Sequence, residues 1–262
     1  YADTQILYGD ADLEVMSVIS GIDINVGEIL LGDRLRQRGI RIDLAIAHHP
    51  SGKAIANLYD VLHVQEDLLH NYGVPINIAE GILHGRVKEI ERAIMPLNHN
   101  QAVDAARLMD LPLLCVHTPA DNLVTKFLQD LFDTAKPELV SDVIELLKEI
   151  PEYKQAAAYG AGPKVVAGDE QRRCGKIMVE MTGGTEGAIE AYAKLAAAGV
   201  GTLIGMHYDE KHRKEAEKNH LNVIIAGHIA SDSLGMNLFL DELQKRGIKI
   251  QPCSGLIRVE RS

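Results

Sequence analysis

Residues 43–50 read Asp-Leu-Ala-Ile-Ala-His-His-Pro, an apolar run that ends in two histidines and a proline. The run at 42–47 has the pattern of a short strand buried inside a sheet. His48 and His49 then stand at its carboxyl end, where α/β sheets place their ligands. Neighbouring side chains of a regular strand point to opposite faces, but Pro50 forces a turn here, so the two imidazoles can splay around one cavity. Each histidine could then serve a different metal ion.

The same arrangement occurs twice more along the chain. A predicted strand at 111–116 ends in His117, and Asp121 follows in the turn into the next helix. A later predicted strand ends in Gly227 and His228, with Asp232 four residues further on. At the start of a helix this spacing puts an imidazole and a carboxylate on one face, with Cβ atoms ~5–6 Å apart. A position in the first turn would also favour the negative charge of the carboxylate.

Each of these residues has an ordinary alternative role. Asp121 could be the N-cap of the helix that follows, Asp232 an ordinary acid of a first helical turn, and a single histidine at a strand end a surface residue. Three such sites together supply three to four histidines and two carboxylates, the set that two borderline divalent cations require. Two such ions ~3.5–4 Å apart typically share a carboxylate and a water, which becomes a nucleophile near neutral pH.

The rest of the chain alternates short β-branched runs with helical patterns, which predicts an α/β fold. Strands are expected at 15–22, 42–47, 75–78, 111–116, 176–181, 202–206, 222–226 and 249–259. Helices are expected at 26–38, 51–71, 85–109 with a break at Pro96, 122–134, 138–150, 185–198, 210–219 and 227–243. The segment 151–173 holds three glycines and a second proline, which predicts a looser connection between two α/β halves, 1–150 and 174–262.

The composition narrows the class of protein. The chain has 262 residues with a formal net charge of −10, 11 histidines and 3 cysteines. The acidic charge argues against a nucleic-acid partner. The cysteines are isolated, so we expect a reducing, cytoplasmic compartment, and any metal site should use histidine and carboxylate rather than thiolate. No apolar run approaches the ~20 residues of a membrane span, so no membrane association is expected.

Common nucleotide-binding motifs are absent from the sequence. Gly52-Lys53 lacks the earlier glycine and the following hydroxyl residue of a phosphate loop, and the run at 160–165 lacks the third glycine of a dinucleotide fingerprint. Gly183-Gly184 could bind an anion before a helix, although such a pair is more often a tight turn.

Taken in order, the motifs H-H-P (48–50), H-T-x-x-D (117–121) and G-H-x-x-S-D (227–232) resemble those of the Nif-three-like family of dinuclear metal-centre proteins. Many bacterial members are described as GTP cyclohydrolase I type 2 homologues. The resemblance implies a single domain over 1–262 with mixed sheets flanked by helices, assembled as a toroidal homohexamer. It also implies five metal ligands, of which the last would bridge both ions: His48, His49, Asp121, His228 and Asp232.

The chain departs from the family pattern in three places. Ser51-Gly52-Lys53 follows H-H-P, where the family commonly has an apolar residue. The family usually has Glu at the position of Asp232, and a carboxylate one methylene shorter needs a closer helix to bridge two ions. The stretch 51–111 is longer and more helical than the usual link between the first two motifs, so the substrate pocket is expected to differ.

We therefore expect a cytoplasmic protein that binds two divalent ions, with Zn, Fe and Mn as candidates. It would hydrolyse a small substrate, for which a nucleotide is one candidate, through a metal-bridging hydroxide. His117, or alternatively His207 at the end of the predicted strand 202–206, would be the general acid or base. The rival interpretation is a non-catalytic metal-binding scaffold or regulatory protein that forms a ring. The two differ in coordination, because a catalytic site keeps an open position and a structural site is closed.

Overall fold

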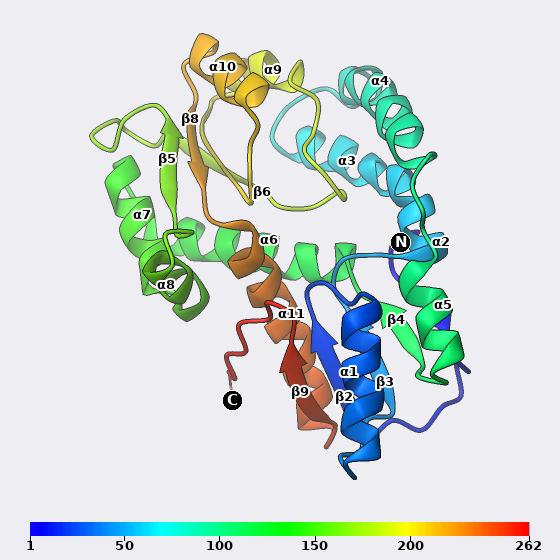
Figure 1. Ribbon diagram of the computed structural model, residues 1–262. Coiled ribbons are helices and arrows are strands. Elements are labelled where there is room, and N and C mark those ends of the chain that lie inside the picture. Colours follow the sequence, from blue (N-terminus) through cyan, green and yellow to red (C-terminus); the bar gives the residue numbers. More distant parts are fainter. Residues whose placement is uncertain (262) are drawn as a thin grey trace.

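Two β-sheets with helices on their faces form the framework of the chain (Figure 1). The structure is a computed structural model and describes residues 1–261. Both sheets are mixed, so the predicted α/β class with mixed sheets flanked by helices is confirmed. Within the described residues, no helix is both long and apolar enough to cross a membrane.

The first sheet has five strands in the order β1-β4-β3-β2-β9. Their bounds are β1 Gln5–Tyr8, β2 Ser17–Gly21, β3 Leu44–Ala47, β4 Leu113–Cys115 and β9 Lys249–Cys253. All pairings are parallel except that of β1 with β4. Every residue of β2 and β3 is buried, as expected for parallel strands covered on both faces. Helices α1 (Val26–Gln37) and α5 (Gln101–Leu108) pack on one face.

The second sheet has four strands in the order β5-β8-β7-β6. Their bounds are β5 Lys164–Ala167, β6 Lys176–Glu180, β7 Val200–Gly205 and β8 Asn222–Ile225, and only β5 runs antiparallel to its neighbour. Side chains of β6 alternate between two cores, because Ile177 and Val179 face one cluster and Met178 the other. The first cluster includes α7 (Val140–Glu149) and α8 (Pro151–Ala158), and the second includes α3 (Val64–Asn71), α4 (Ile76–Ile94), α9 (Ala191–Ala197) and α10 (Glu210–Lys218).

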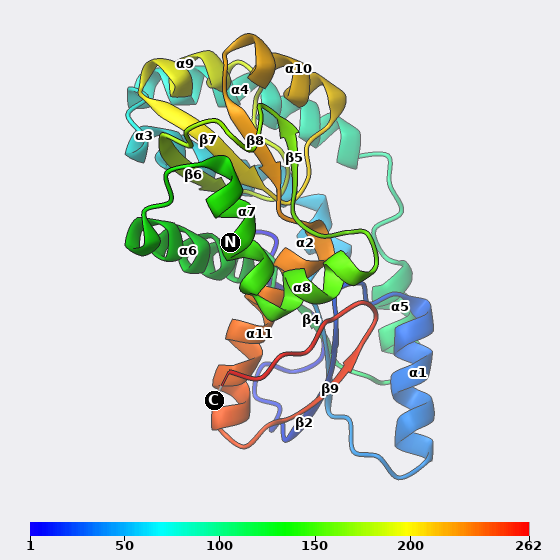
Figure 2. The same cartoon turned by 90° about the vertical axis from the view of Figure 1, so that its left-hand side faces the viewer.

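Two long helices join the sheets, α6 (Thr118–Ala135) and α11 (His228–Lys245). The first half of α11 packs in the core of the second sheet through Leu234, and its second half packs in the core of the first sheet through Leu240. The two helices cross closely at Gly235, where a Cβ atom would lie 2.4 Å from the Ala120 carbonyl oxygen. Figure 2 shows both helices at the level where the two sheets meet.

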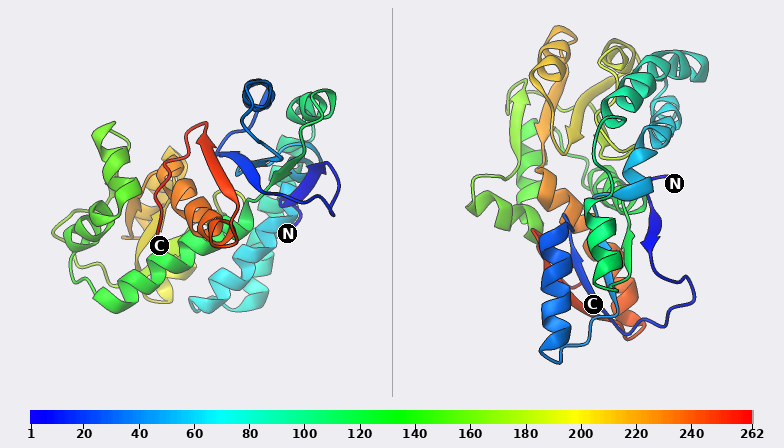
Figure 3. Two further views of the ribbon diagram at one scale, coloured as in Figure 1. Left: turned by 90° about the horizontal axis from the view of Figure 1, so that it is seen from below. Right: turned by 45° about the vertical axis from the view of Figure 1, so that its right-hand side comes forward.

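The last strand returns to the first sheet. β9 pairs in parallel with β2, and Figure 3 shows the red β9 beside the dark blue β2. Residues 249–253, from the second half of the sequence, therefore complete the sheet built by the first half. The single domain over 1–262, and its division near 151–173, stay predictions.

Several predicted elements differ from those observed. Residues 75–78 were expected as a strand but begin α4, because a short apolar run cannot distinguish a strand from a helix by periodicity. The expected loose segment 151–173 contains α8 and β5. Pro151 stands at the first position of α8, where a proline favours a helix instead of breaking it.

Helix boundaries also shift. The predicted helix 51–71 is three pieces, namely α2 (Gly52–Ala56), the 3₁₀ helix η1 (Leu58–His63) and α3. The predicted helix 185–198 begins only at Ala191, after a turn in which Gly183 and Gly184 both have positive φ. The final strand ends at Cys253 rather than at residue 259.

Candidate metal centre

His48 lies at the carboxyl end of β3 and is fully buried. Its Nδ1 is 3.0 Å from the carbonyl oxygen of Val116, which can only accept, so Nδ1 donates a proton there and the ring is held in place. Its Nε2 lies 3.4 Å from one oxygen of Asp121 and 3.4 Å from one oxygen of Asp232. The side chain thus presents one nitrogen to two buried carboxylates.

His49 is oriented in the same way by a different partner. Its Nδ1 is 2.7 Å from Asp23, which follows β2, and its Nε2 is 3.3 Å from the second oxygen of Asp232. The turn at Pro50 allows both neighbouring imidazoles to approach Asp232, with their ring centroids 5.2 Å apart. The two rings therefore converge on one carboxylate, that of Asp232.

His117 is the N-cap residue of α6, and its Nδ1 lies 2.8 Å from Asp3 near the start of the chain. Asp3 is fully buried and also accepts hydrogen bonds from the backbone and the hydroxyl of Thr118. Asp121 lies in the first turn of α6 and is 4% exposed. Because His117 occupies the cap position, the alternative role of Asp121 as an N-cap is excluded.

His228 begins α11, and its Nε2 lies 3.5 Å from Asp232. Asp232 itself is 1% exposed and lies just past the first turn, in which the structure has no acidic residue, so the expected first-turn position is wrong. The two residues are four positions apart, as the predicted shared helix face requires. His207 follows β7, with its ring centroid 4.8 Å from that of His228, and its Nδ1 is 2.8 Å from Glu186.

Together these side chains form three overlapping groups whose ligand atoms lie within 4.8 Å of one another. We call them the histidine–aspartate cluster. All five residues predicted as ligands belong to it, and so does His117, which was predicted as a catalytic residue. Among the described residues, the groups do not include His207. The groups are His48, His49 and His117; His49, His228 and Asp232; and His48, Asp121 and Asp232.

The cluster contains buried polar atoms that have no hydrogen-bond partner among the described residues. These atoms are His48 Nε2, Asp121 Oδ1 and both carboxylate oxygens of Asp232. A buried polar atom without a partner costs about 1–3 kcal/mol, so four of them in one place indicate a missing partner. Imidazole nitrogen and carboxylate oxygen suit borderline divalent cations, and the donor set therefore fits such ions.

The electrostatics favour positive charge at the centre. Burial alone would lower the pKa of His48, but the carboxylate of Asp232 outweighs it and raises that pKa to about 9. Burial opposes ionisation of Asp232 too, yet His48 and His49 lower its pKa. Burial raises the pKa of Asp121. Protons on the imidazoles thus supply the positive charge that a divalent ion would replace.

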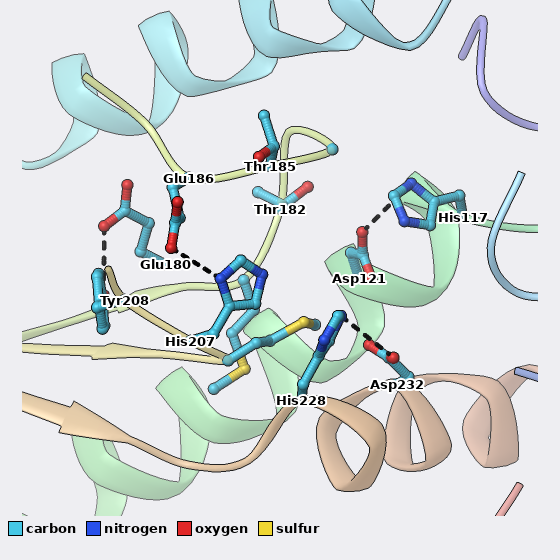
Figure 4. Close-up of a pocket in the computed structure, with 13 residues that line it drawn as sticks. His117, Asp121, Glu180, Thr182, Thr185, Glu186, His207, Tyr208, His228 and Asp232 are labelled. Carbon is cyan, nitrogen blue, oxygen red and sulfur yellow. Dashed lines mark hydrogen bonds and ion pairs between the residues drawn. The ribbon is translucent and has the colours of Figure 1, made fainter. Parts of the chain in front are cut away.

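A pocket opens beside the cluster at the carboxyl end of the second sheet (Figure 4). The view shows Asp121, His228 and Asp232 on one side of His207, with Glu180 and Tyr208 on the other. Glu180 is the last residue of β6, and burial raises the pKa of its carboxyl to about 7. The hydrogen bond from His207 lowers the pKa of Glu186.

Four carboxylates of this region were not predicted, namely Asp3, Asp23, Glu180 and Glu186. A signal did exist for two of them: Asp23 follows β2 and Glu180 ends β6, and both are strand ends like the predicted sites. Asp3 lies in an irregular segment before β1 and has no such signal.

The fold and the cluster define an α/β protein in which histidine and aspartate groups that could hold metal lie where two mixed sheets meet. Neither a family model nor a curated protein matches the chain. A solved structure does, the NIF3 superfamily protein from Sphaerobacter thermophilus, with 30% sequence identity and a TM-score of 0.84 over 98% of this chain and 92% of that chain. The chain therefore belongs to the NIF3 superfamily, as predicted.

More distant structures share the fold alone. Reduced HcgD from Methanocaldococcus jannaschii is 15% identical, with a TM-score of 0.58 over 94% of this chain and 87% of that chain. The protein TTHA1606 from Thermus thermophilus is 14% identical, with a TM-score of 0.51 over 95% of this chain and 86% of that chain.

Proposed function

We propose that this protein binds two divalent metal ions in the histidine–aspartate cluster and hydrolyses a small substrate there. The observation that carries the proposal is the set of four buried atoms that have no hydrogen-bond partner and whose contacts with neighbouring imidazoles and carboxylates are 3.3–3.5 Å long. The outward nitrogens of His48, His49 and His117 are each held by a carbonyl or carboxylate oxygen. Metal-binding histidines typically have such a partner, which fixes the ring and its tautomer.

The overlap of the groups supports an assignment of the ligands. Asp232 belongs to two of the three groups and offers one oxygen to His48 and the other to His49 and His228. We assign it as the carboxylate shared by both ions. Asp121 and His48 would be the further ligands of one ion, and His49 and His228 those of the other. His117 would lie beside them. Zn, Fe and Mn are the candidate metals for this donor set.

Divalent ions held in the cluster would supply Lewis acidity and lower the pKa of a bound water. The protein's own residues would move the protons. His207 faces the pocket, and the carboxylate of Glu186 holds its Nδ1, so its other nitrogen is directed for exchange with a substrate. His117 is the alternative acid or base, held by Asp3. A nucleotide is one candidate substrate.

Metal analysis of protein purified without chelator tests the metal centre. We expect up to two ions per chain, and a value near zero in folded protein would overturn the proposal. A screen of phosphoesters and nucleotides with added Mn, Zn or Fe, comparing wild type with His49→Ala, tests the hydrolysis. If metal binds but no substrate turns over, the protein is a metal-binding scaffold or regulatory partner instead.

We also propose that the chain assembles as a homohexamer, as the family resemblance implies. Helix α1 exposes large apolar side chains at Val26, Leu30 and Leu31, which are 41%, 47% and 44% exposed. Such side chains commonly become buried in subunit contacts. Light scattering on the purified protein measures the mass directly, and a monomer at micromolar concentration would contradict the hexamer. The cytoplasmic location stays a prediction.

A further inference from the structure

The pocket beside the cluster has an end whose chemistry the proposed hydrolysis does not use. Glu180 and Tyr208 form this end, on the far side of His207 from Asp121 (Figure 4). The hydroxyl of Tyr208 donates to Glu180 at 3.4 Å, a long hydrogen bond. We call these two residues the distal end of the pocket.

The carboxyl groups that line the pocket differ in whether they have a cationic partner. Among the described residues that line it, none is a lysine or an arginine. The carboxylates of Asp121 and Asp232 face the imidazoles of the cluster, and Glu186 is paired with His207. Glu180 has only the neutral hydroxyl of Tyr208, so it is the one lining carboxyl with no cationic partner among these residues.

A buried acceptor without a hydrogen-bond partner lies near Glu180, outside the residues that line the pocket. Gln65 is 2% exposed, and its amide nitrogen donates to the carbonyl oxygens of Thr182 and Thr185. Its amide oxygen has no partner among the described residues. A Cβ atom on Gly187 would lie 2.9 Å from this oxygen and 2.9 Å from Glu180 Oε1, so both acceptors border the same glycine.

Of these two acceptors, only Glu180 lines the pocket, and its carboxylate matches a ligand that brings N–H groups. We propose that Glu180 selects substrates whose distal end carries adjacent N–H donors, such as an amidine, a guanidine or an amino-substituted heterocycle. This inference rests on the proposed function, since it takes the cluster as the reacting end. A carboxylate binds two parallel N–H groups side by side, whereas it repels a phosphate or a second carboxylate. The distal end therefore excludes an anionic group.

Acetamidinium, acetamide and acetate test this selection, because they share one heavy-atom skeleton and differ in N–H donors and charge. Binding to the purified protein is measured by ligand-observed NMR at pH 7.5. We expect wild type to bind acetamidinium most tightly, acetamide less tightly, and acetate without any dependence on Glu180. Glu180→Gln should weaken acetamidinium binding at least tenfold. Glu190→Gln makes the same charge change at an exposed residue outside the pocket and should change binding less than twofold.

A second variant tests the site by adding a methyl group beside Glu180. Gly187 has no positive φ, so the backbone can accept an alanine there, but the methyl group of Gly187→Ala would displace the head groups of both Glu180 and Gln65. It should weaken acetamidinium binding to a similar degree without loss of metal. Unchanged binding in Glu180→Gln would overturn the inference, even if metal analysis supports the cluster. The converse result is also informative. If the purified protein holds no metal, the proposed hydrolase is contradicted, and acetamidinium binding that still depends on Glu180 would support the proposed selection.

Discussion

At the scale of single residues, the proposed histidine ligands are oriented by hydrogen-bond partners at their Nδ1 atoms, and these partners can be tested by mutation. Asp23 accepts from His49 Nδ1 at 2.7 Å, while its own side chain is 51% exposed. Asp23 therefore contributes little to folding stability, and its main role should be to orient the His49 ring. Partners of this kind typically change metal affinity by about 10–100-fold.

Asp23→Asn should accordingly weaken metal binding by roughly 10–100-fold and leave the unfolding temperature of the metal-free protein unchanged. The reason is that an amide no longer draws the Nδ1 proton of His49 with a full charge. Competition with a chelating dye measures the affinity. Asp12→Asn, an exposed acid remote from the cluster, is the control. Equal affinities in the two variants would show that Asp23 does not orient His49 for metal binding.

The raised pKa of Glu180 gives a prediction about stability and pH. A carboxyl whose pKa rises from 4.5 to about 7 on folding binds its proton more tightly in the folded state. Its ionisation therefore costs stability as pH rises through that window. In metal-free protein, Glu180→Gln should match wild type near pH 4 and exceed its stability by about 3 kcal/mol at pH 8. Urea denaturation at several pH values measures this, and a gain independent of pH would show that burial of the charge is not its cause.

The residues that were predicted and those that were missed differ in a physical respect. His48, His117 and His228 each follow an apolar run, so local sequence marks the strand ends on which they stand. Asp3 acts on His117 across 114 residues of sequence, through a packing arrangement that no local pattern encodes. Local patterns thus identify the proposed ligands, while the residues that orient them depend on the tertiary fold.

At the scale of elements, the crossing of α6 and α11 sets the distance between the two buried aspartates. Asp121 is one residue after Ala120, and Asp232 is three residues before Gly235, where the helices touch. Close contact without a side chain brings both carboxylates within 3.4 Å of the same nitrogen of His48. The close approach is the condition that the shorter Asp232, in place of the usual Glu, requires for bridging.

Gly235→Ala should therefore disturb the cluster as well as the fold. Its Cβ would lie 2.4 Å from the Ala120 carbonyl oxygen, so the helices must separate, at a cost of about 1–3 kcal/mol. Metal content should fall with it. Gly81→Ala is the matched control, because Gly81 also lies inside a helix but has nothing near its Cβ position, and it should stabilise by about 0.5–1 kcal/mol. Full metal content in Gly235→Ala would show that metal binding does not depend on the close crossing of the two helices.

Sequence patterns located most of the elements but not how the sheets are completed. The runs that became β2, β3, β4, β6, β7, β8 and β9 were all predicted, and all of them except the exposed edge strand β9 are largely buried. β1 and β5 were missed, and each is an edge strand that is only partly buried. Their apolar runs, 6–8 and 165–167, are only three residues long, which is too short to distinguish a strand from a loop by pattern.

At the scale of the whole molecule, the cluster lies where two separate cores meet. His48 and His49 extend from the first sheet, whereas His228 follows β8 of the second, and α11 runs from one core into the other. Ions bound between these groups would connect the sheets directly. Because such ions bind the folded state alone, they would stabilise it by about 4 kcal/mol when free metal exceeds the dissociation constant a thousandfold.

Removal of metal should therefore lower the unfolding temperature of the whole chain. For a protein of this size, about 4 kcal/mol corresponds to a decrease of roughly 10 °C. Differential scanning calorimetry with and without a chelator measures the change in wild type and in Asp232→Ala. The variant should already unfold at a lower temperature and should respond little to chelator, because its shared ligand is gone. A large response in the variant would mean that the stabilising ion is held without Asp232, and a single cooperative transition in wild type would indicate that the two cores unfold together.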